Sequence, residues 1–352
     1  MMIRSNQNIA ILLHDGILGT QGKTGLAMLR YSEAPIVAII DRATAGKSLT
    51  ELTGLPRSIP IVASVTDAMP FQPNVLAIGI APSGGGLPPE WRGELHTAIA
   101  AGLLIVNGLH TRLNDDLELR LLLKSDLKSD QWIWDVRQEP PGLKVGSGAA
   151  RQLACLRVLT VGTDMSVGKM STSLELDRAS RKRGLRSKFL ATGQAGIMIS
   201  GAGVPLDAVR VDFASGAIEQ LVLAAPEAEI LHIEGQGSLL NPASTATLPL
   251  IRGSQPTHLI LVHRAGQTHI RTVPHVSIPP LREVIQVYET VATAGGAFAP
   301  VRVAAIALNT AHLDAASAQQ AIEQAKLETG LPCTDPVRHG ADLLLDAVLR
   351  SP

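Results

Sequence analysis

The chain has 352 residues, and 31 Lys and Arg residues balance 31 Asp and Glu residues, so its formal net charge is zero. A neutral chain argues against nucleic acid and against anionic membranes as partners, and an aromatic content of 3% offers few rings for base stacking. Two cysteines without CxxC spacing exclude a disulfide framework and a cysteine metal cluster. We expect a cytoplasmic protein with two aliphatic α/β domains, and we further expect a homo-oligomer.

The first half of the sequence alternates short apolar runs with helical patterns. Strands are predicted at residues 9–13, 35–40, 60–63, 75–80 and 103–106, with helical patterns after the first strand and at residues 90–101. Strands that alternate with helices are typical of βαβ units and a parallel sheet. Residues 1–148 are therefore predicted to form a Rossmann-like parallel sheet domain, which ends in a linker rich in Pro and Gly.

The second half repeats this rhythm. Strands are predicted at residues 155–161, 187–190, 229–233, 257–262 and 301–308, and a helix at residues 315–329. Because the first of these strands leads directly into a glycine loop and a helix, residues 149–352 are predicted to form a P-loop NTPase-like parallel sheet domain.

The strongest motif covers residues 162–171. Glycines let successive N–H groups point at a phosphate, the helix N-terminus adds its positive dipole end, and Lys169 supplies a mobile charge. The residues predicted to bind the cofactor here are Gly162, Thr163, Asp164, Gly168, Lys169, Met170 and Ser171. Met170 occupies the usual place of a Mg²⁺-binding hydroxyl, which leaves Ser171 or Thr172 for that role. The alternative is a glycine-rich turn with an incidental lysine.

Three polar residues are predicted at the ends of later strands. Glu234 precedes a Gly-x-Gly turn and should point into the crevice at the carboxyl edge of the sheet, where it could bind Mg²⁺. Asp212 is interpreted as another strand-end carboxylate, and Asn309 as an amide that could reach a base edge. The alternatives are a solvated loop acid for each carboxylate and a turn-capping amide for Asn309.

Ordered stretches in both halves resemble known proteins. They are residues 22–24, 29–32, 37–42, 78–85, 108–110, 134–137, 161–170, 191–194, 234–239 and 335–338. The phosphate loop, the Glu-Gly-x-Gly strand end and the Leu-Asn strand end resemble dethiobiotin synthetase and its P-loop relatives. Over nearly the whole chain the sequence resembles a family of two-domain P-loop proteins whose named members are D-glutamate N-acetyltransferases. The resemblance implies acetylation of an acidic amino acid, with Gln194 and Gln236 among the substrate-binding residues.

The first domain carries a second Gly-Lys-Thr turn after its first strand. Lys23 and Thr24 are predicted to bind substrate or phosphate. The alternative is that this turn only connects the strand to the helix. Asp41 ends the second strand, where an acid could reach ribose hydroxyls, but the GxGxxG spacing of a dinucleotide site is absent. His110 follows a strand and is the best-placed histidine for acid–base catalysis, or else a hydrogen-bonded turn residue.

These residues support three hypotheses about function. In the first, Lys169 and its loop hold the diphosphate of acetyl-CoA or ATP. Lys23 or Arg338 then pairs with the carboxylate of a small acidic substrate, and His110 or Glu234 accepts the amine proton. In the second, ATP activates a carboxylate, with Mg²⁺ held by Ser171, Asp212 and Glu234. In the third, the chain senses a nucleotide without turnover, which Met170 favours because it weakens the metal site.

Overall fold

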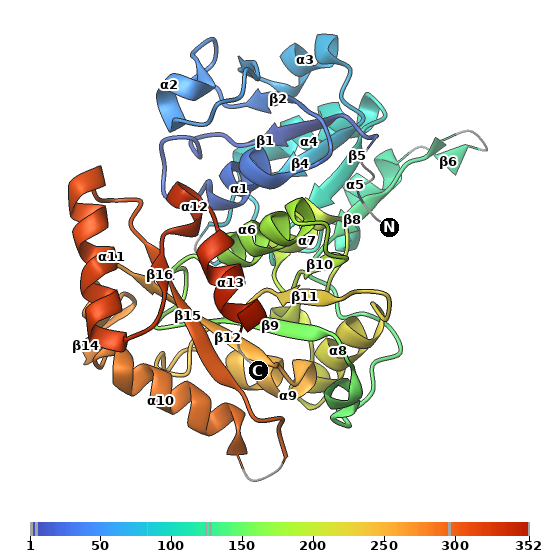
Figure 1. Ribbon diagram of the computed structural model, residues 1–352. Coiled ribbons are helices and arrows are strands. Elements are labelled where there is room, and N and C mark those ends of the chain that lie inside the picture. Colours follow the sequence, from blue (N-terminus) through green and yellow to red (C-terminus); the bar gives the residue numbers. More distant parts are fainter. Residues whose placement is uncertain are drawn as a thin grey trace. The chain divides into compact units, whose positions relative to one another are not determined.

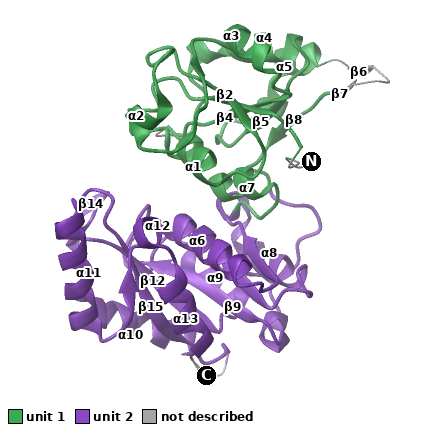
Figure 2. Ribbon diagram, turned by 45° about the horizontal axis from the view of Figure 1, so that its top comes forward, with its two compact units in different colours: residues 1–138, 194–205 green, residues 139–193, 206–352 purple. Residues whose placement is uncertain are grey.

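A computed structural model describes residues 3, 6–82, 84–123, 125–126, 129–294 and 297–350 (Figure 1). The chain divides into two compact units (Figure 2), which are Met1–Gln138 with Gln194–Pro205, and Glu139–Gly193 with Leu206–Pro352. Each unit contains a six-stranded parallel sheet with helices, so the predicted fold class is confirmed. Among the described residues, no helix combines the length and apolarity that crossing a bilayer requires.

Unit 1 has the strand order β3-β2-β1-β4-β5-β8. The strands are β1 (Ile9–Leu12), β2 (Ile36–Ile40), β3 (Ile61–Val62), β4 (Val75–Ile78), β5 (Leu104–Asn107) and β8 (Ile133–Asp135), and a separate hairpin pairs β6 (Ser125–Asp126) with β7 (Ser129–Asp130). The helices are α1 (Lys23–Tyr31), α2 (Leu49–Thr53), α3 (Val65–Ala68), α4 (Arg92–Ala100), α5 (Leu117–Leu122) and α7 (Gln194–Ser200). The strand order changes direction between β1 and β4, because β2 and β3 lie on one side of β1 whereas β4, β5 and β8 lie on the other. Ligands of open α/β sheets bind at the carboxyl ends of the two strands at such a point.

Unit 2 has the order β10-β11-β9-β12-β15-β16. The strands are β9 (Leu156–Gly162), β10 (Ser187–Leu190), β11 (Ile230–Ile233), β12 (His258–Arg264), β15 (Arg302–Asn309) and β16 (Cys333–Thr334), with an antiparallel pair β13 (His269–Ile270) and β14 (Val273–Ser277). The helices are α6 (Lys169–Lys182), α8 (Val211–Leu223), α9 (Thr247–Ser254), α10 (Leu281–Ala292), α11 (Ala315–Thr329), α12 (Pro336–His339) and α13 (Asp342–Arg350).

The unit 2 sheet is buried on both faces. Leu159 of β9 faces one core with Ile218 of α8 and Tyr288 of α10, whereas Val158 faces a second core with Leu176 of α6. Strands covered on both faces appear as continuous apolar runs in the sequence, and for this reason the sequence predicts the inner strands of both sheets. It also predicts the edge strands β3 and β10, at residues 60–63 and 187–190, but it does not predict the edge strands β8 and β16.

The division between the units differs from the boundary predicted at residue 148. Residues 139–148 pack on unit 2, where the Ser147 N–H and hydroxyl bind the Glu219 carboxylate of α8. Residues 194–205 return to unit 1, where α7 packs against α1. A helical pattern in the sequence does not reveal which sheet it covers, so this excursion leaves no local signal.

Candidate phosphate-binding site

The loop between β9 and α6 has a conformation that depends on glycine. Gly168 precedes α6 with a φ of +119°, and Ser166 has a φ of +58°. A Cβ on Gly162 would lie 2.9 Å from Val167 Cγ2 and 3.1 Å from Lys169 Nζ. The chain therefore curls closely around the Lys169 side chain, and a larger residue at either glycine would open the loop.

Lys169 is the first residue of α6 and only 6% of it is exposed. Its ammonium donates a hydrogen bond of 2.8 Å to the main-chain carbonyl of Asp164. Met170 and Ser171 follow it in the first turn and are half-buried. Because α6 has 14 residues, its N-terminus places the positive end of a helix dipole beside the lysine charge.

Asp164 anchors this loop from the inside. Its Oδ1 accepts hydrogen bonds from the Met165 N–H (2.7 Å) and Asn241 Nδ2 (2.8 Å), and its Oδ2 accepts from Gln267 Nε2 (2.7 Å) and the Arg271 N–H (2.9 Å). Burial by itself would raise the pKa of Asp164, but these four hydrogen bonds outweigh it and lower the pKa. The side chain predicted to contact a cofactor is thus bonded to the protein, and it fixes the loop.

The ends of two neighbouring strands brace the same loop. Thr163 Oγ1 lies 2.9 Å from Nδ1 of His263 on β12, and burial lowers the pKa of His263 to about 4. Asn309, the last residue of β15, donates a hydrogen bond of 2.9 Å to the Val167 carbonyl. Its amide oxygen accepts from the Ala311 N–H at 3.1 Å, so both ends of the amide contact the protein.

Glu234 directly follows β11 and is 2% exposed. Its Oε2 accepts hydrogen bonds from the N–H groups of Thr192 (2.9 Å) and Gly193 (3.1 Å), and its Oε1 accepts from Gln236 Nε2 (3.1 Å). Burial raises the pKa of Glu234 to about 7, and the two N–H groups and the charge of Lys169 limit the rise. A carboxyl group with a pKa near neutrality can accept or donate a proton at physiological pH.

The structure corrects the placement of one predicted Mg²⁺ ligand. The prediction that Asp212 ends a strand is wrong, because Asp212 is exposed in the first turn of α8, where an acid interacts favourably with the helix dipole. Three residues of apolar–polar alternation fit a helix start as well as a strand. Both oxygens of Glu234 already accept hydrogen bonds, and within the described part of the chain no three His, Cys, Asp or Glu side chains gather to hold a metal ion. Of the three predicted ligands, Ser171 lies in the first turn of α6 and Glu234 lies directly after β11, as the sequence predicts.

Arg338 lies in α12 and braces the end of β15. Its Nη2 donates to the carbonyls of Leu313 (2.8 Å) and Thr310 (3.2 Å). Asp335 caps α12 through its Oδ1, which accepts from the Arg338 N–H, and its Oδ2 accepts from the Thr310 hydroxyl. The guanidinium of this exposed residue is therefore held beside the carboxyl edge of the sheet.

Four predicted site residues belong to unit 1. Lys23 and Thr24 are the first two residues of α1, and Lys23 is exposed whereas Thr24 is buried. Gln194 begins α7, and a Cβ on Gly108 would lie 3.3 Å from its Cγ. The fourth residue, His110, lies three residues after β5.

His110 is exposed on a loop after β5. Its N–H donates to the Gly85 carbonyl at 2.9 Å, and a Cβ on Gly85, which has a φ of +67°, would lie 2.1 Å from the His110 ring. Desolvation of the ring and the charge of Arg137 lower the pKa of His110, so the ring is neutral at pH 7. This state suits a proton acceptor.

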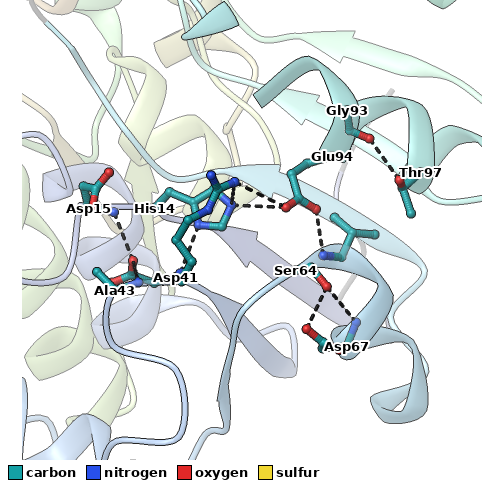
Figure 3. A network of polar contacts seen from close by, with 11 residues as sticks. His14, Asp15, Asp41, Ala43, Ser64, Asp67, Gly93, Glu94 and Thr97 are labelled. Atoms are coloured by element: carbon teal, nitrogen blue, oxygen red, sulfur yellow. Dashed lines mark hydrogen bonds and ion pairs between the residues drawn. The ribbon is translucent and has the colours of Figure 1, made fainter. Parts of the chain in front are cut away.

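A buried polar cluster in unit 1 is absent from the sequence predictions (Figure 3). His14 follows β1 and is 2% exposed, and its Nδ1 accepts a hydrogen bond of 3.2 Å from the Arg42 N–H. Its Nε2 lies 3.3 Å from Oε1 of Glu94 on α4 and 3.1 Å from Nη2 of Arg42. Burial, followed by the charge of Arg42, lowers the pKa of His14. A histidine directly after an apolar strand was the available signal, but its partner Glu94 is 80 residues away.

Asp41, which directly follows β2, has a structural role in this unit. It is 1% exposed, its Oδ1 accepts from the Asp15 N–H (3.0 Å), and its Oδ2 accepts from the Thr44 hydroxyl (2.7 Å). The carboxylate at the end of β2 thus holds the start of the loop between β1 and α1.

Comparisons with known proteins cover both units. The P-loop domain of a family described as a domain of unknown function, DUF1611, matches residues 144–345, and its Rossmann-like N-terminal domain matches residues 42–139. A protein of Pseudoalteromonas sp. named D-glutamate N-acetyltransferase is 38% identical over 286 residues, which cover 80% of this chain and 83% of that protein. A protein of the same name from Tritonibacter scottomollicae is 39% identical over 279 residues, which cover 78% of this chain and 81% of that protein.

A solved structure agrees with these matches. The crystal structure of a DUF1611 family protein from Anabaena variabilis is 64% identical and has a TM-score of 0.94, covering 98% of this chain and 100% of that chain. The loop between β9 and α6 therefore lies in a P-loop domain, as its sequence predicts. The chain belongs to the DUF1611 family, in which a Rossmann-like N-terminal domain precedes a P-loop domain.

Proposed function

We propose that this chain transfers the acetyl group of acetyl-CoA to the amino group of an acidic amino acid such as D-glutamate. The observation that carries the proposal is the electrostatic interaction of Lys169, at the N-terminus of α6, with the buried Glu234, whose pKa burial raises to about 7. The two relatives named D-glutamate N-acetyltransferase, 38% and 39% identical, support the choice of reaction.

Lys169 is proposed to bind the diphosphate of CoA together with the N–H groups of the first turn of α6. Its ammonium is bonded to the neutral carbonyl of Asp164. Exchange of this carbonyl for a phosphate oxygen favours the ligand, because a charge-assisted hydrogen bond is about twice as strong as one to a neutral acceptor. Asp164 and Asn309 support the site indirectly, since both hold the loop in place.

Acetyl transfer requires an amine that has lost its proton. The amine nitrogen attacks the acetyl carbonyl carbon, the N–C bond forms, the C–S bond of the thioester breaks, and the CoA thiolate leaves and takes up a proton. Glu234 is the proposed acceptor of the amine proton because its pKa is about 7, and Gln236 orients it through the hydrogen bond to Oε1. Arg338 is the proposed partner of the substrate carboxylate in this unit. In unit 1, the neutral His110 is the second candidate for the base.

The test is an acetylation assay with acetyl-CoA and D-glutamate for the wild type, Lys169→Met and the matched control Lys182→Met, at the exposed end of α6. We expect kcat/KM to fall roughly a hundredfold in Lys169→Met and to stay unchanged in Lys182→Met. Equal turnover in all three proteins would remove the loop from the mechanism. Carboxylate-dependent release of ADP from ATP, without acetyl transfer, would instead assign an ATP-dependent ligase, and nucleotide binding without turnover would assign a sensor.

A further inference from the structure

Thr24 of unit 1 has a hydroxyl that the protein leaves unsatisfied. The residue is 1% exposed, and within the described residues its Oγ1 has no hydrogen-bond partner. Several other helical threonines donate to the carbonyl four residues earlier, as Thr97 does with Gly93 at 2.9 Å and Thr172 with Gly168 at 3.1 Å. For Thr24 that carbonyl belongs to Thr20, outside α1. Burying a hydroxyl without a partner costs free energy, so its retention indicates a ligand.

The position of Thr24 directs this hydroxyl toward the N-terminus of α1. Side chains of a helix tilt toward its N-terminus, and Thr24 is the second residue of this nine-residue helix. The N–H groups of Gly25 and Leu26 are already bonded to the Gly79 and Gly22 carbonyls. The Thr24 N–H has no backbone acceptor among the described residues. The N–H and the hydroxyl of Thr24 are therefore both available as donors at the N-terminus of α1.

The loop before α1 is held in a defined shape. A Cβ on Gly19 would lie 2.2 Å from the Asp15 carbonyl oxygen, and one on Gly22 would lie 2.0 Å from the Gly16 carbonyl oxygen. Asp15 itself has a φ of +57°, and its N–H is bonded to the buried Asp41 carboxylate, as Figure 3 shows. Because the backbone of this loop is restricted, the N-terminus of α1 is pre-organised for a small ligand.

We propose that the first turn of α1 binds an oxyanion, either a carboxylate or a phosphate, through the hydroxyl and N–H of Thr24. The helix dipole and the exposed Lys23 give this end the matching charge. This site lies in unit 1 and goes beyond the proposed function, which depends on the P-loop of unit 2.

The test uses the full chain with Thr24→Val, which keeps the shape and removes the hydroxyl, and Thr24→Ser, which restores it. Thr97→Val is the matched control, because its hydroxyl is satisfied within α4. Binding of D-glutamate, inorganic phosphate and CoA is measured by calorimetry. The same variants are made in a Lys169→Met background, so that binding at the P-loop does not mask the result.

We expect Thr24→Val to weaken one probe at least tenfold, with recovery in Thr24→Ser and no change in Thr97→Val. Weaker binding of D-glutamate alone identifies a carboxylate site, and weaker binding of phosphate or CoA identifies a phosphate site. Thermal unfolding of the ligand-free Thr24→Val chain should occur at the same or a higher temperature, which a structural hydroxyl would not allow. Equal affinities for all probes in wild type and Thr24→Val, or no binding of any probe to the wild type, would overturn the proposal. Either outcome is independent of the Lys169→Met assay.

Discussion

Asn309 Nδ2 at the end of β15 donates a hydrogen bond of 2.9 Å to the carbonyl oxygen of Val167, in the loop that precedes α6. The two residues are 142 positions apart in the sequence. The end of β15 thus fixes the loop that follows β9, and β12 lies between these two strands in the sheet. The amide therefore contributes to phosphate binding by holding the loop carbonyl, and a ligand need not touch it.

Replacement of this amide should loosen the loop. In Asn309→Ala the Val167 carbonyl loses its donor, so we expect the free energy of unfolding to fall by about 1 kcal/mol and CoA affinity to fall several-fold. Urea unfolding and calorimetry measure the two effects. The control is Gln319→Ala on the exposed face of α11, whose amide donates to the Glu323 carboxylate of the same helix. Unchanged CoA affinity in Asn309→Ala would show that the Asn309 amide does not position the P-loop for CoA.

Glu234 should give the protein a distinctive pH dependence. Between pH 4.5, its ordinary pKa, and about 7, the folded chain keeps a proton that the unfolded chain has lost. The free energy of unfolding therefore falls as pH rises through this window, by up to about 3 kcal/mol. Glu234→Gln removes this dependence, which is measured as the difference between the two proteins in urea titrations at pH 5 and pH 8.

The same variant tests the proposed base. Wild-type acetyl transfer should rise with pH up to about 7, as Glu234 loses its proton, whereas Glu234→Gln should be inactive across the range. An active Glu234→Gln enzyme with an unchanged pH profile would transfer this role to another group, with His110→Gln as the next variant.

Gly235 is expected to be irreplaceable for a steric reason. A Cβ there would lie 1.7 Å from the Thr160 carbonyl oxygen and 2.9 Å from Lys169 Cδ. We expect Gly235→Ala to lower the free energy of unfolding by about 1–3 kcal/mol or to displace Lys169. The matched control is Gly93→Ala in α4, where a Cβ meets nothing within 4 Å, and it should leave the protein as stable or more stable. Similar melting temperatures for the two variants would show that the backbone at Gly235 can move.

The same substitution should destabilise the protein far more at Asp164 than at Asp212. Asp164→Asn places an amide among four hydrogen-bond donors, so we expect a loss of about 3 kcal/mol in the free energy of unfolding. Asp212→Asn on the exposed first turn of α8 should cost only a few tenths of a kcal/mol. It should also leave any Mg²⁺ dependence of activity unchanged, whereas a changed dependence would return Asp212 to the site.

Much of the fold is predictable because its signals are local. Parallel strands covered on both faces must be apolar throughout, so β1, β9 and β12 stand out in the sequence. The edge strands are predicted only in part, since β3 and β10 are found in the sequence whereas β8 and β16 are not. Asp212 shows that a segment of three residues is too short to distinguish a helix from a strand, because the first residues of α8 fit both patterns.

The sequence by itself determined the P-loop, because strand, glycines, lysine and helix are consecutive and each acts on its neighbours. The tertiary structure alone decided which distant side chains hold that loop, since Asn309, Asn241 and Gln267 meet it only when the strands and loops of unit 2 assemble. It also decided that the Asp41 carboxylate bonds to the Asp15 N–H, and that the buried Thr24 hydroxyl has no hydrogen-bond partner among the residues that the structure describes. Whether a polar atom is satisfied depends on every element packed around it, and no local pattern records that environment.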